Sequence, residues 1–173
     1  MNKAILKAML VGSAFMCTLP QFALAHGGDA HAKKSEAPKL EQTAWGMAGE
    51  AKKVQHTISI NMSDAMRFSP DRLQVKQGDT VRLKITNTGK IMHELVLGTK
   101  AVLDAHAEMM LQHPGMEHDE PYMAHVTPGQ TGEIIWHFNR AGEFDFACLI
   151  AGHYQAGMRG KITVMAAKAE HKH

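Results

Sequence analysis

From Val54 onward the chain alternates apolar and polar residues with a period of two, the pattern of a β-strand that buries one face. The alternation recurs in short segments separated by turn residues such as Lys76-Gln77-Gly78-Asp79 and Pro128-Gly129. The predicted strands have the sequences VQHTISI, RLQV, TVRLKITN, IMHELVLG, TGEIIWHF, GEFDFACL and GKITVMA. This pattern predicts an all-β sandwich or barrel that forms one domain over residues 54–166.

One segment between the predicted strands lacks the alternation. Residues 100–112 (KAVLDAHAEMMLQ) are rich in good helix formers and predict a helix. The residues that follow, 113–122 (HPGMEHDEPY), are polar and rich in turn formers. Together they predict an insertion over about residues 100–125, made of a helix and an irregular connection.

The two ends of the chain differ from the predicted domain. Residues 1–25 combine a positively charged start, a short apolar stretch and a small-x-small cleavage site, so they predict a secretion signal. Residues 26–53 have little apolar content and predict a flexible tail that carries histidines, and residues 167–173 predict a second, charged tail. No later stretch is apolar enough to cross a membrane, so we expect an exported protein that is not inserted into a membrane after signal cleavage.

Charge and composition narrow the function. The formal net charge is +2 and becomes zero once Lys3 and Lys7 leave with the signal, which argues against nucleic acid as a partner. Cys17 would leave as well, and the remaining Cys148 could not form an internal disulfide in an oxidising compartment. The chain also holds 12 histidines and 13 methionines. Thiolate, imidazole and thioether groups together indicate a site for a soft metal ion.

Three of these groups lie close together in the segment FACLIAGHYQAGM. Cys148, His153 and Met158 are spaced C-x4-H-x4-M, and the glycines between them permit a tight loop. A second histidine, His93, lies far upstream, just after a turn and at the start of a predicted strand. Two histidines, one cysteine and a weak thioether form the ligand set that suits copper best.

Other interpretations of these residues were weighed. Singly, Cys148 or Met158 could pack in a core, and His93 could be a hydrogen-bonded surface histidine; their conjunction favours a metal. Zinc prefers four strong ligands to a thioether. A cysteine–histidine hydrolase would need an orienting Asn or Asp and an oxyanion hole, which the sequence does not single out.

The strands together with NTGKIMHE and CLIAGHYQAGM resemble the cupredoxins, the blue-copper fold of plastocyanin, azurin and auracyanin, over roughly residues 54–165. The resemblance implies a Greek-key β-sandwich in which His93, Cys148 and His153 are the equatorial ligands of a type 1 copper and Met158 is the axial ligand. The ligand spacing is closer to auracyanin than to plastocyanin. With its histidine-bearing N-terminus and its Met/His insertion, the chain is most similar to the periplasmic copper-tolerance cupredoxins of the CopI type, which implies a periplasmic location.

The resemblance leaves two functions open. The chain could bind copper for copper tolerance, or it could be a small soluble electron carrier for a respiratory or photosynthetic partner. In multicopper oxidases and copper nitrite reductases, histidines beside the cysteine lead to a catalytic copper, whereas Ala147 and Leu149 flank Cys148 here. We therefore do not expect an oxidase or reductase acting alone, although Cu(I) oxidation and a periplasmic copper-handling or redox partner stay open.

The insertion favours copper tolerance because it carries further soft ligands. Four fall at i, i+3, i+4 and i+7 of the predicted helix, so that one helical face could present His106, Met109, Met110 and His113. Others follow the helix, namely Met116, His118, Met123 and His125, and the tail adds His26 and His31. Alternatively, Met109 or Met110 packs the helix onto the sandwich, and the tail only improves solubility. His171 and His173 are weaker candidates, and His56 and His137 are expected to be structural.

Overall fold

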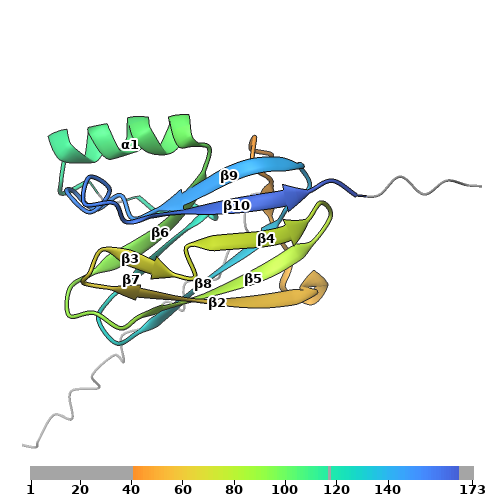
Figure 1. Cartoon of the computed structure of the whole chain (residues 1–173), viewed down its shortest axis with the longest axis horizontal. Helices are drawn as coiled ribbons and strands as arrows, with labels where there is room; N and C mark the ends of the chain where they lie inside the picture. The colour runs from red at the N-terminus through yellow and green to blue at the C-terminus, as the bar shows by residue number, and fades with distance from the viewer. Residues whose placement is uncertain (1–40, 117, 168–173) are drawn as a thin grey trace, which may run out of the picture. The chain divides into compact units, whose positions relative to one another are not determined.

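The computed structural model of the protein describes residues 41–116 and 118–167. Its strands form two five-stranded sheets that pack face to face around one large hydrophobic core (Figure 1). The first sheet has the strand order β1 (Met47–Ala48), β8 (Thr131–His137), β5 (Thr80–Asn87), β2 (His56–Ser63) and β3 (Arg67–Ser69). The second has the order β4 (Arg72–Lys76), β10 (Arg159–Met165), β9 (Gly142–Ala147), β6 (His93–Gly98) and β7 (Met123–Val126).

The period-two alternation seen in the sequence places alternate side chains in the core. In β4, for example, Leu73 and Val75 are buried whereas the residues on either side of them are exposed. Strand β6 differs, because all six of its residues are buried. It lies beneath the helix as well as over the core, so both of its faces are covered. The predicted all-β sandwich with one short helix is thus confirmed.

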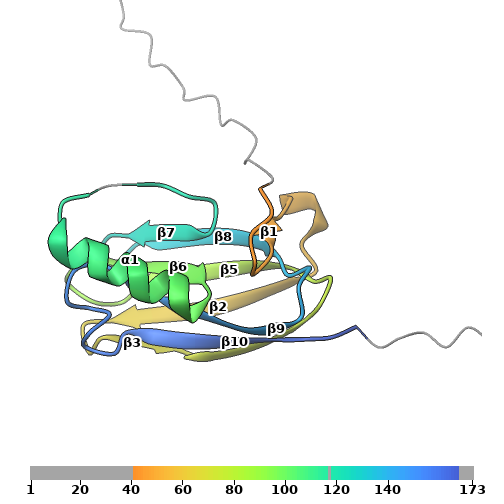
Figure 2. The same cartoon turned by 90° about the horizontal axis from the view of Figure 1, so that it is seen from above.

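Helix α1 (Lys100–Gln112) occupies the residues predicted for it. It begins after Thr99, whose hydroxyl accepts a hydrogen bond from the Val102 backbone N–H at 3.4 Å. Leu103, Ala107 and Met110 are spaced four and three residues apart and are buried, and they pack the helix against β6 and β9 (Figure 1). The connection that leaves the helix passes above β7 in Figure 2.

The prediction of a flexible tail over residues 26–53 is wrong for its last part. Strand β1 pairs with β8, and a 3-10 helix, η1 (Ala51–Lys53), follows it. Trp45 is only 8% exposed, its ring meets the ring of Tyr122 edge to face at 5.4 Å, and its carbonyl accepts a hydrogen bond from Trp136 Nε1–H at 3.0 Å. These contacts extend the folded domain to about residue 43. The predicted signal, the rest of this tail and residues 168–173 lie outside the described residues.

Two short strands besides β1 were absent from the prediction. Strand β3 was not expected, and β7 begins inside the segment assigned to the insertion, which therefore ends at residue 122. Across the described residues, no helix has both the length and the apolar character that a membrane span requires.

Candidate metal centre

Three predicted ligands meet at one end of the second sheet. His93 is the first residue of β6, Cys148 directly follows β9, and His153 lies in the loop that leads to β10. Strands β6 and β9 are antiparallel neighbours, so the start of one lies beside the end of the other. The potential ligand atoms of the three side chains all lie within 4.8 Å of one another, and Cys148 Sγ is 3.3 Å from His153 Nδ1.

The surroundings of His93 suit a metal ligand. The side chain is fully buried, and its Nε2 lies 3.1 Å from Oδ1 of Asp64. The other ring nitrogen, Nδ1, is buried and has no hydrogen-bond partner among the described residues. An unpaired buried polar atom costs about 1–3 kcal/mol, and a metal ion bound to Nδ1 would remove that cost. Donation of the second ring N–H to a carboxylate is usual for histidines that bind metals.

Asp64 is itself held in place. Its carboxylate accepts a hydrogen bond from the Lys90 backbone N–H at 2.8 Å. This hydrogen bond, together with the one from His93, lowers the pKa of Asp64. The carboxylate is therefore ionised at neutral pH and can orient the imidazole of His93.

The thiol of Cys148 is fully buried. Burial raises its pKa to about 12, although the Glu94 backbone N–H, which donates to Sγ at 3.4 Å, acts in the opposite direction. Without a metal the thiol is therefore protonated at neutral pH, and a bound metal ion would have to displace the proton. Burial, followed by the proximity of His93, lowers the pKa of His153, which favours the neutral ring that can bind a metal.

The loop from Cys148 to Met158 is closed on itself. The Cys148 backbone N–H donates to the Met158 carbonyl at 3.1 Å, and the Met158 N–H donates to the His153 carbonyl at 3.1 Å. Gly152 and Gly157 have φ values of +89° and +92°, which side chains other than glycine rarely adopt. Met158 is fully buried in the same core cluster as Cys148. Its role as the axial ligand stays a prediction.

Asn87 holds the segment that leads to His93. Its Nδ2 donates to the carbonyls of Ile91 and Val126 at 2.8 Å each, and its Oδ1 accepts from the Gly89 N–H at 2.8 Å. The side chain is completely buried. Sequence reasoning missed both Asn87 and Asp64, because each is a common polar residue beside a turn, and Val126, which Asn87 contacts, and His93, which Asp64 contacts, are distant from them in the chain.

Glu94 is a third residue that sequence reasoning missed. Its side chain is only 3% exposed, and its two carboxylate oxygens lie 2.8 Å from the Leu149 backbone N–H, which donates to Oε1, and 2.8 Å from His125 Nε2. Burial raises the pKa of this carboxyl. An acidic residue inside the otherwise apolar strand HELVLG was a signal that could have identified it.

The structure separates the additional ligands predicted in the insertion. Met110 and Met123 are buried in the packing of α1 on the sheet, so Met110 cannot share an exposed face with Met109, and the predicted common face is wrong in this respect. Met109, His113 and Met116 are exposed. Three others form a cluster, which consists of His106, His118 and His125. The tail residues His26 and His31 lie outside the described residues.

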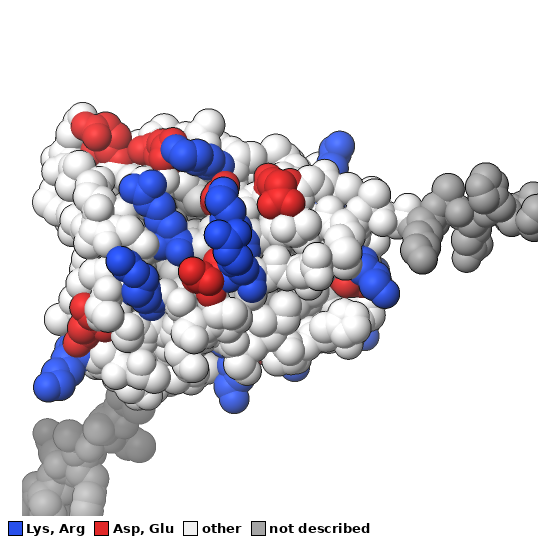
Figure 3. Space-filling model, in the orientation of Figure 1, with Lys and Arg blue, Asp and Glu red and all other residues white. Residues whose placement is uncertain are grey.

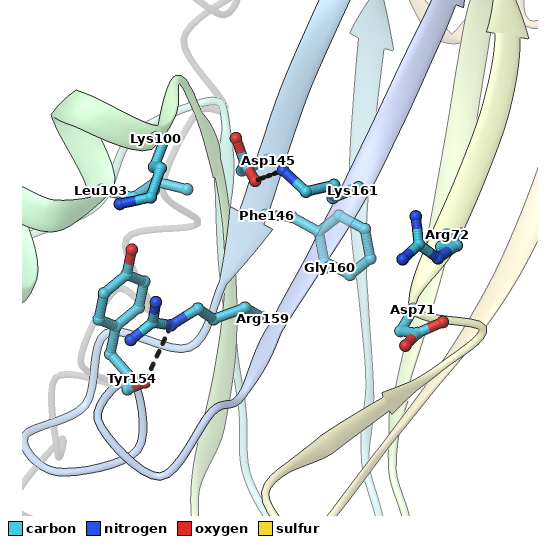
Figure 4. A pocket seen from close by; sticks show the side chains of 10 residues that line it. All are labelled: Asp71, Arg72, Lys100, Leu103, Asp145, Phe146, Tyr154, Arg159, Gly160 and Lys161. Atoms are coloured by element: carbon cyan, nitrogen blue, oxygen red, sulfur yellow. Dashed lines mark hydrogen bonds and ion pairs between the residues drawn. The ribbon is translucent and has the colours of Figure 1, made fainter.

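Lysine and arginine side chains gather on the face of the domain seen in Figure 3, where β4, β9 and β10 lie in Figure 1. A hollow of about 270 Å³ lies on this side, next to α1 (Figure 4). Two of the cations that line it have partners: Lys161 pairs with Asp145 at 3.0 Å, and the Arg159 guanidinium lies over the Tyr154 ring, 3.7 Å from its centroid. The hydroxyl of Tyr154, a residue of the ligand loop, donates to Asp104 of α1. The hydrogen bond between Tyr154 and Asp104, beside this hollow, therefore links the ligand loop to the helix.

Comparison with known proteins agrees with this geometry. Residues 53–165 match the family described as copper binding proteins of the plastocyanin/azurin family, so the chain belongs to this family of cupredoxins and its cofactor is copper. The chain is 44% identical to the "Copper-resistant cuproprotein CopI" of Rubrivivax gelatinosus, over 94% of its own length and 98% of that protein. A protein of the same name from Pseudomonas aeruginosa is 33% identical over 75% of this chain and 87% of its own length.

Solved structures share the fold. Auracyanin B superposes with a TM-score of 0.58 and 22% identity, over 69% of this chain and 96% of its own. The reduced auracyanin of Roseiflexus castenholzii gives a TM-score of 0.56 and 20% identity, over 64% of this chain and 98% of its own. Both the predicted family and the predicted cofactor are confirmed.

Proposed function

We propose that the protein holds a type 1 redox copper through His93, Cys148 and His153, with Met158 as a weak axial ligand, and that it protects the periplasm from excess copper. The observation that carries the proposal is the convergence of these three donors around the unpaired Nδ1 of His93. The names of the relatives, which describe copper-resistant cuproproteins, support the role in tolerance.

The protein environment would tune the metal. Two imidazoles, a thiolate and a thioether accept both Cu(I) and Cu(II) with little rearrangement, so copper there can gain or lose an electron readily. Asp64 fixes the orientation of His93, and burial keeps water away from the thiolate. The hydrogen bond from the Glu94 N–H withdraws electron density from the sulfur, which favours Cu(I).

The metal centre is tested by adding Cu(II) to the purified protein. We expect an intense visible absorption from charge transfer between thiolate and copper, and we expect Cys148→Ala to abolish it. His56→Ala, which changes an exposed histidine of β2, is the control and should keep the band. Retention of the band by the Cys148 variant would show that this residue is not a ligand.

Copper tolerance is tested against the alternative of a soluble electron carrier in cells. Deletion of the gene should impair growth in elevated copper and leave respiration without added copper unchanged. Complementation with the Cys148→Ala variant should fail to restore growth, whereas His56→Ala should restore it. A respiratory defect together with normal copper tolerance would favour the electron carrier.

A further inference from the structure

The insertion and strand β7 bring together a second group of histidines, separate from the centre described above. His106 lies on α1, His118 lies in the connection after it, and His125 lies on β7. The ring centroids of His106 and His118 are 4.6 Å apart, and those of His118 and His125 are 6.4 Å apart. The path of the connection above β7, visible in Figure 2, makes this approach possible, since the three residues come from three different segments.

Three ring nitrogens of this cluster lack partners among the described residues. Nε2 of His106 and both ring nitrogens of His118 are buried and have no hydrogen-bond partner in the described part of the chain. Each such atom costs about 1–3 kcal/mol unless something binds it. Burial, and then the proximity of His118, lowers the pKa of His106, so its ring is neutral and keeps a lone pair for a metal ion. Packing alone gives no reason to bury three unpaired nitrogens in two adjacent rings.

His125 already has the support that metal-binding histidines usually have. Its Nε2 lies 2.8 Å from Oε2 of the buried Glu94. A ligating histidine commonly donates one ring N–H to a carboxylate and binds the metal through the other nitrogen. The pair repeats the relation between His93 and Asp64 in the first centre. Nδ1 of His125 is then the nitrogen available to a metal.

We propose that His106, His118 and His125 form a second copper site, with Glu94 orienting His125. The choice of copper rests on the proposed function, whereas the site itself rests on the cluster. Three imidazoles bind copper in either oxidation state, and of the divalent ions of the first transition row Cu(II) binds such ligands most tightly. The half-exposed Met92 lines the hollow of about 730 Å³ that His118 and His125 also line, so its thioether can contact arriving Cu(I).

The second site is looser than the first. In the described residues, only His93, Cys148 and His153 hold their ligand atoms within 4.8 Å of one another. The side chain of His125 is 36% exposed, so it has room to turn toward the other two rings. His106 and His118 would bind the ion first, and His125 would complete the site.

Glu94 joins the two sites. Its carboxylate contacts His125 and the Leu149 N–H, and its own backbone N–H donates to Cys148 Sγ. Copper bound to His125 withdraws electron density from the ring and therefore changes its hydrogen bond with Glu94. We expect this change to reach the thiolate, so that filling the second site shifts the visible band of the first.

The test uses the full mature chain in which the tail histidines His26, His31, His171 and His173 are replaced by glutamine. Cu(II) is added until the visible band is complete, and further copper is then followed by equilibrium dialysis and electron paramagnetic resonance. We expect a second equivalent with hyperfine coupling to imidazole nitrogen and a shift of the visible band. His118→Gln should weaken this second equivalent at least tenfold, whereas the control His56→Gln should leave it unchanged.

The same samples separate the two proposals. Absence of the visible band in the unmodified protein contradicts the type 1 centre. A normal band with only one bound copper, or a second equivalent of equal affinity in His118→Gln, overturns the second site. The band also reports folding, so its persistence in His118→Gln shows that weaker binding is local. In a parallel sample, Zn²⁺ is added in place of the second equivalent of copper. If copper added afterwards does not displace this Zn²⁺, the choice of copper as the metal is overturned.

Discussion

Replacement of Asn87 by alanine should destabilise the metal-free protein strongly. The Asn87 side chain is fully buried and makes three hydrogen bonds of 2.8 Å, to the carbonyls of Ile91 and Val126 and from the N–H of Gly89. Alanine can make none of them, and the three backbone groups lose this partner. At about 1 kcal/mol for each hydrogen bond, the free energy of unfolding should fall by about 3 kcal/mol. This is a large share of the 5–15 kcal/mol or so that is typical of a folded domain.

The assay is unfolding in guanidinium chloride, followed by the fluorescence of the two tryptophans. Asn139→Ala is the matched control, because that residue also makes three side-chain hydrogen bonds, but the two with Gln42 are exposed and the third, to Met47 Sδ, is long at 3.5 Å. We expect the control to change the free energy of unfolding by less than about 1 kcal/mol. Equal effects of the two substitutions, or a loss below about 1 kcal/mol for Asn87→Ala, would refute the view that Asn87 anchors the segment before His93.

Three further predictions concern the ligand loop and its supports. Met158→Leu should keep copper bound and raise the reduction potential in voltammetry, since a donor that stabilises Cu(II) is lost; complete loss of copper would argue against an axial role. Gly160→Ala should lower the free energy of unfolding by about 3 kcal/mol or more in urea, because the added Cβ would lie 2.0 Å from Cζ of Phe146; an unchanged midpoint would contradict this. Metal-free protein should lose stability as the pH rises from about 8.5 toward 12, since the unfolded Cys148 thiol ionises while the folded thiol, with its pKa raised to about 12, stays protonated. Cys148→Ala should lose less stability over the same range, and equal pH dependence in both proteins would contradict the raised pKa.

The strands and the helix could be predicted because their signals are local. Alternation marks the long strands other than β6, and α1 begins after a capping threonine and contains a run of good helix formers. The segment around Trp45 could not be predicted in this way. It is folded because Trp45 packs against Tyr122 and its carbonyl accepts a hydrogen bond from Trp136, and both partners are far away in the chain.

The candidate ligands could likewise be predicted where local signals carry them, but not where contacts between distant segments decide their positions. His93, Cys148 and His153 could be assigned to one site because a recognisable strand start and a recognisable loop carry them. The predicted helical face would have exposed Met110. Met110 instead belongs to an apolar stripe with Leu103 and Ala107, and this stripe packs against the sheet. The meeting of His106, His118 and His125 depends on the path of an irregular connection, which residue spacing alone does not specify.

The pairing of β6 with β7 has a consequence for how such a protein can change over time. The insertion departs from β6 and returns to β7, and these strands are joined by the pair Val96–Met123 and by the hydrogen bond from the Leu97 N–H to the Tyr122 carbonyl at 3.0 Å. The insertion is thus the connection of a β-hairpin formed by β6 and β7, and the pairing of these strands holds the two ends of the insertion together. Doubling the length of a flexible loop adds only about 0.6 kcal/mol to the entropic cost of closing it. A connection whose ends are already paired can therefore be lengthened, shortened or exchanged with little loss of stability of the sandwich. Selection could therefore alter the insertion with little effect on strand β6, which begins at His93, and strand β9, which ends just before Cys148.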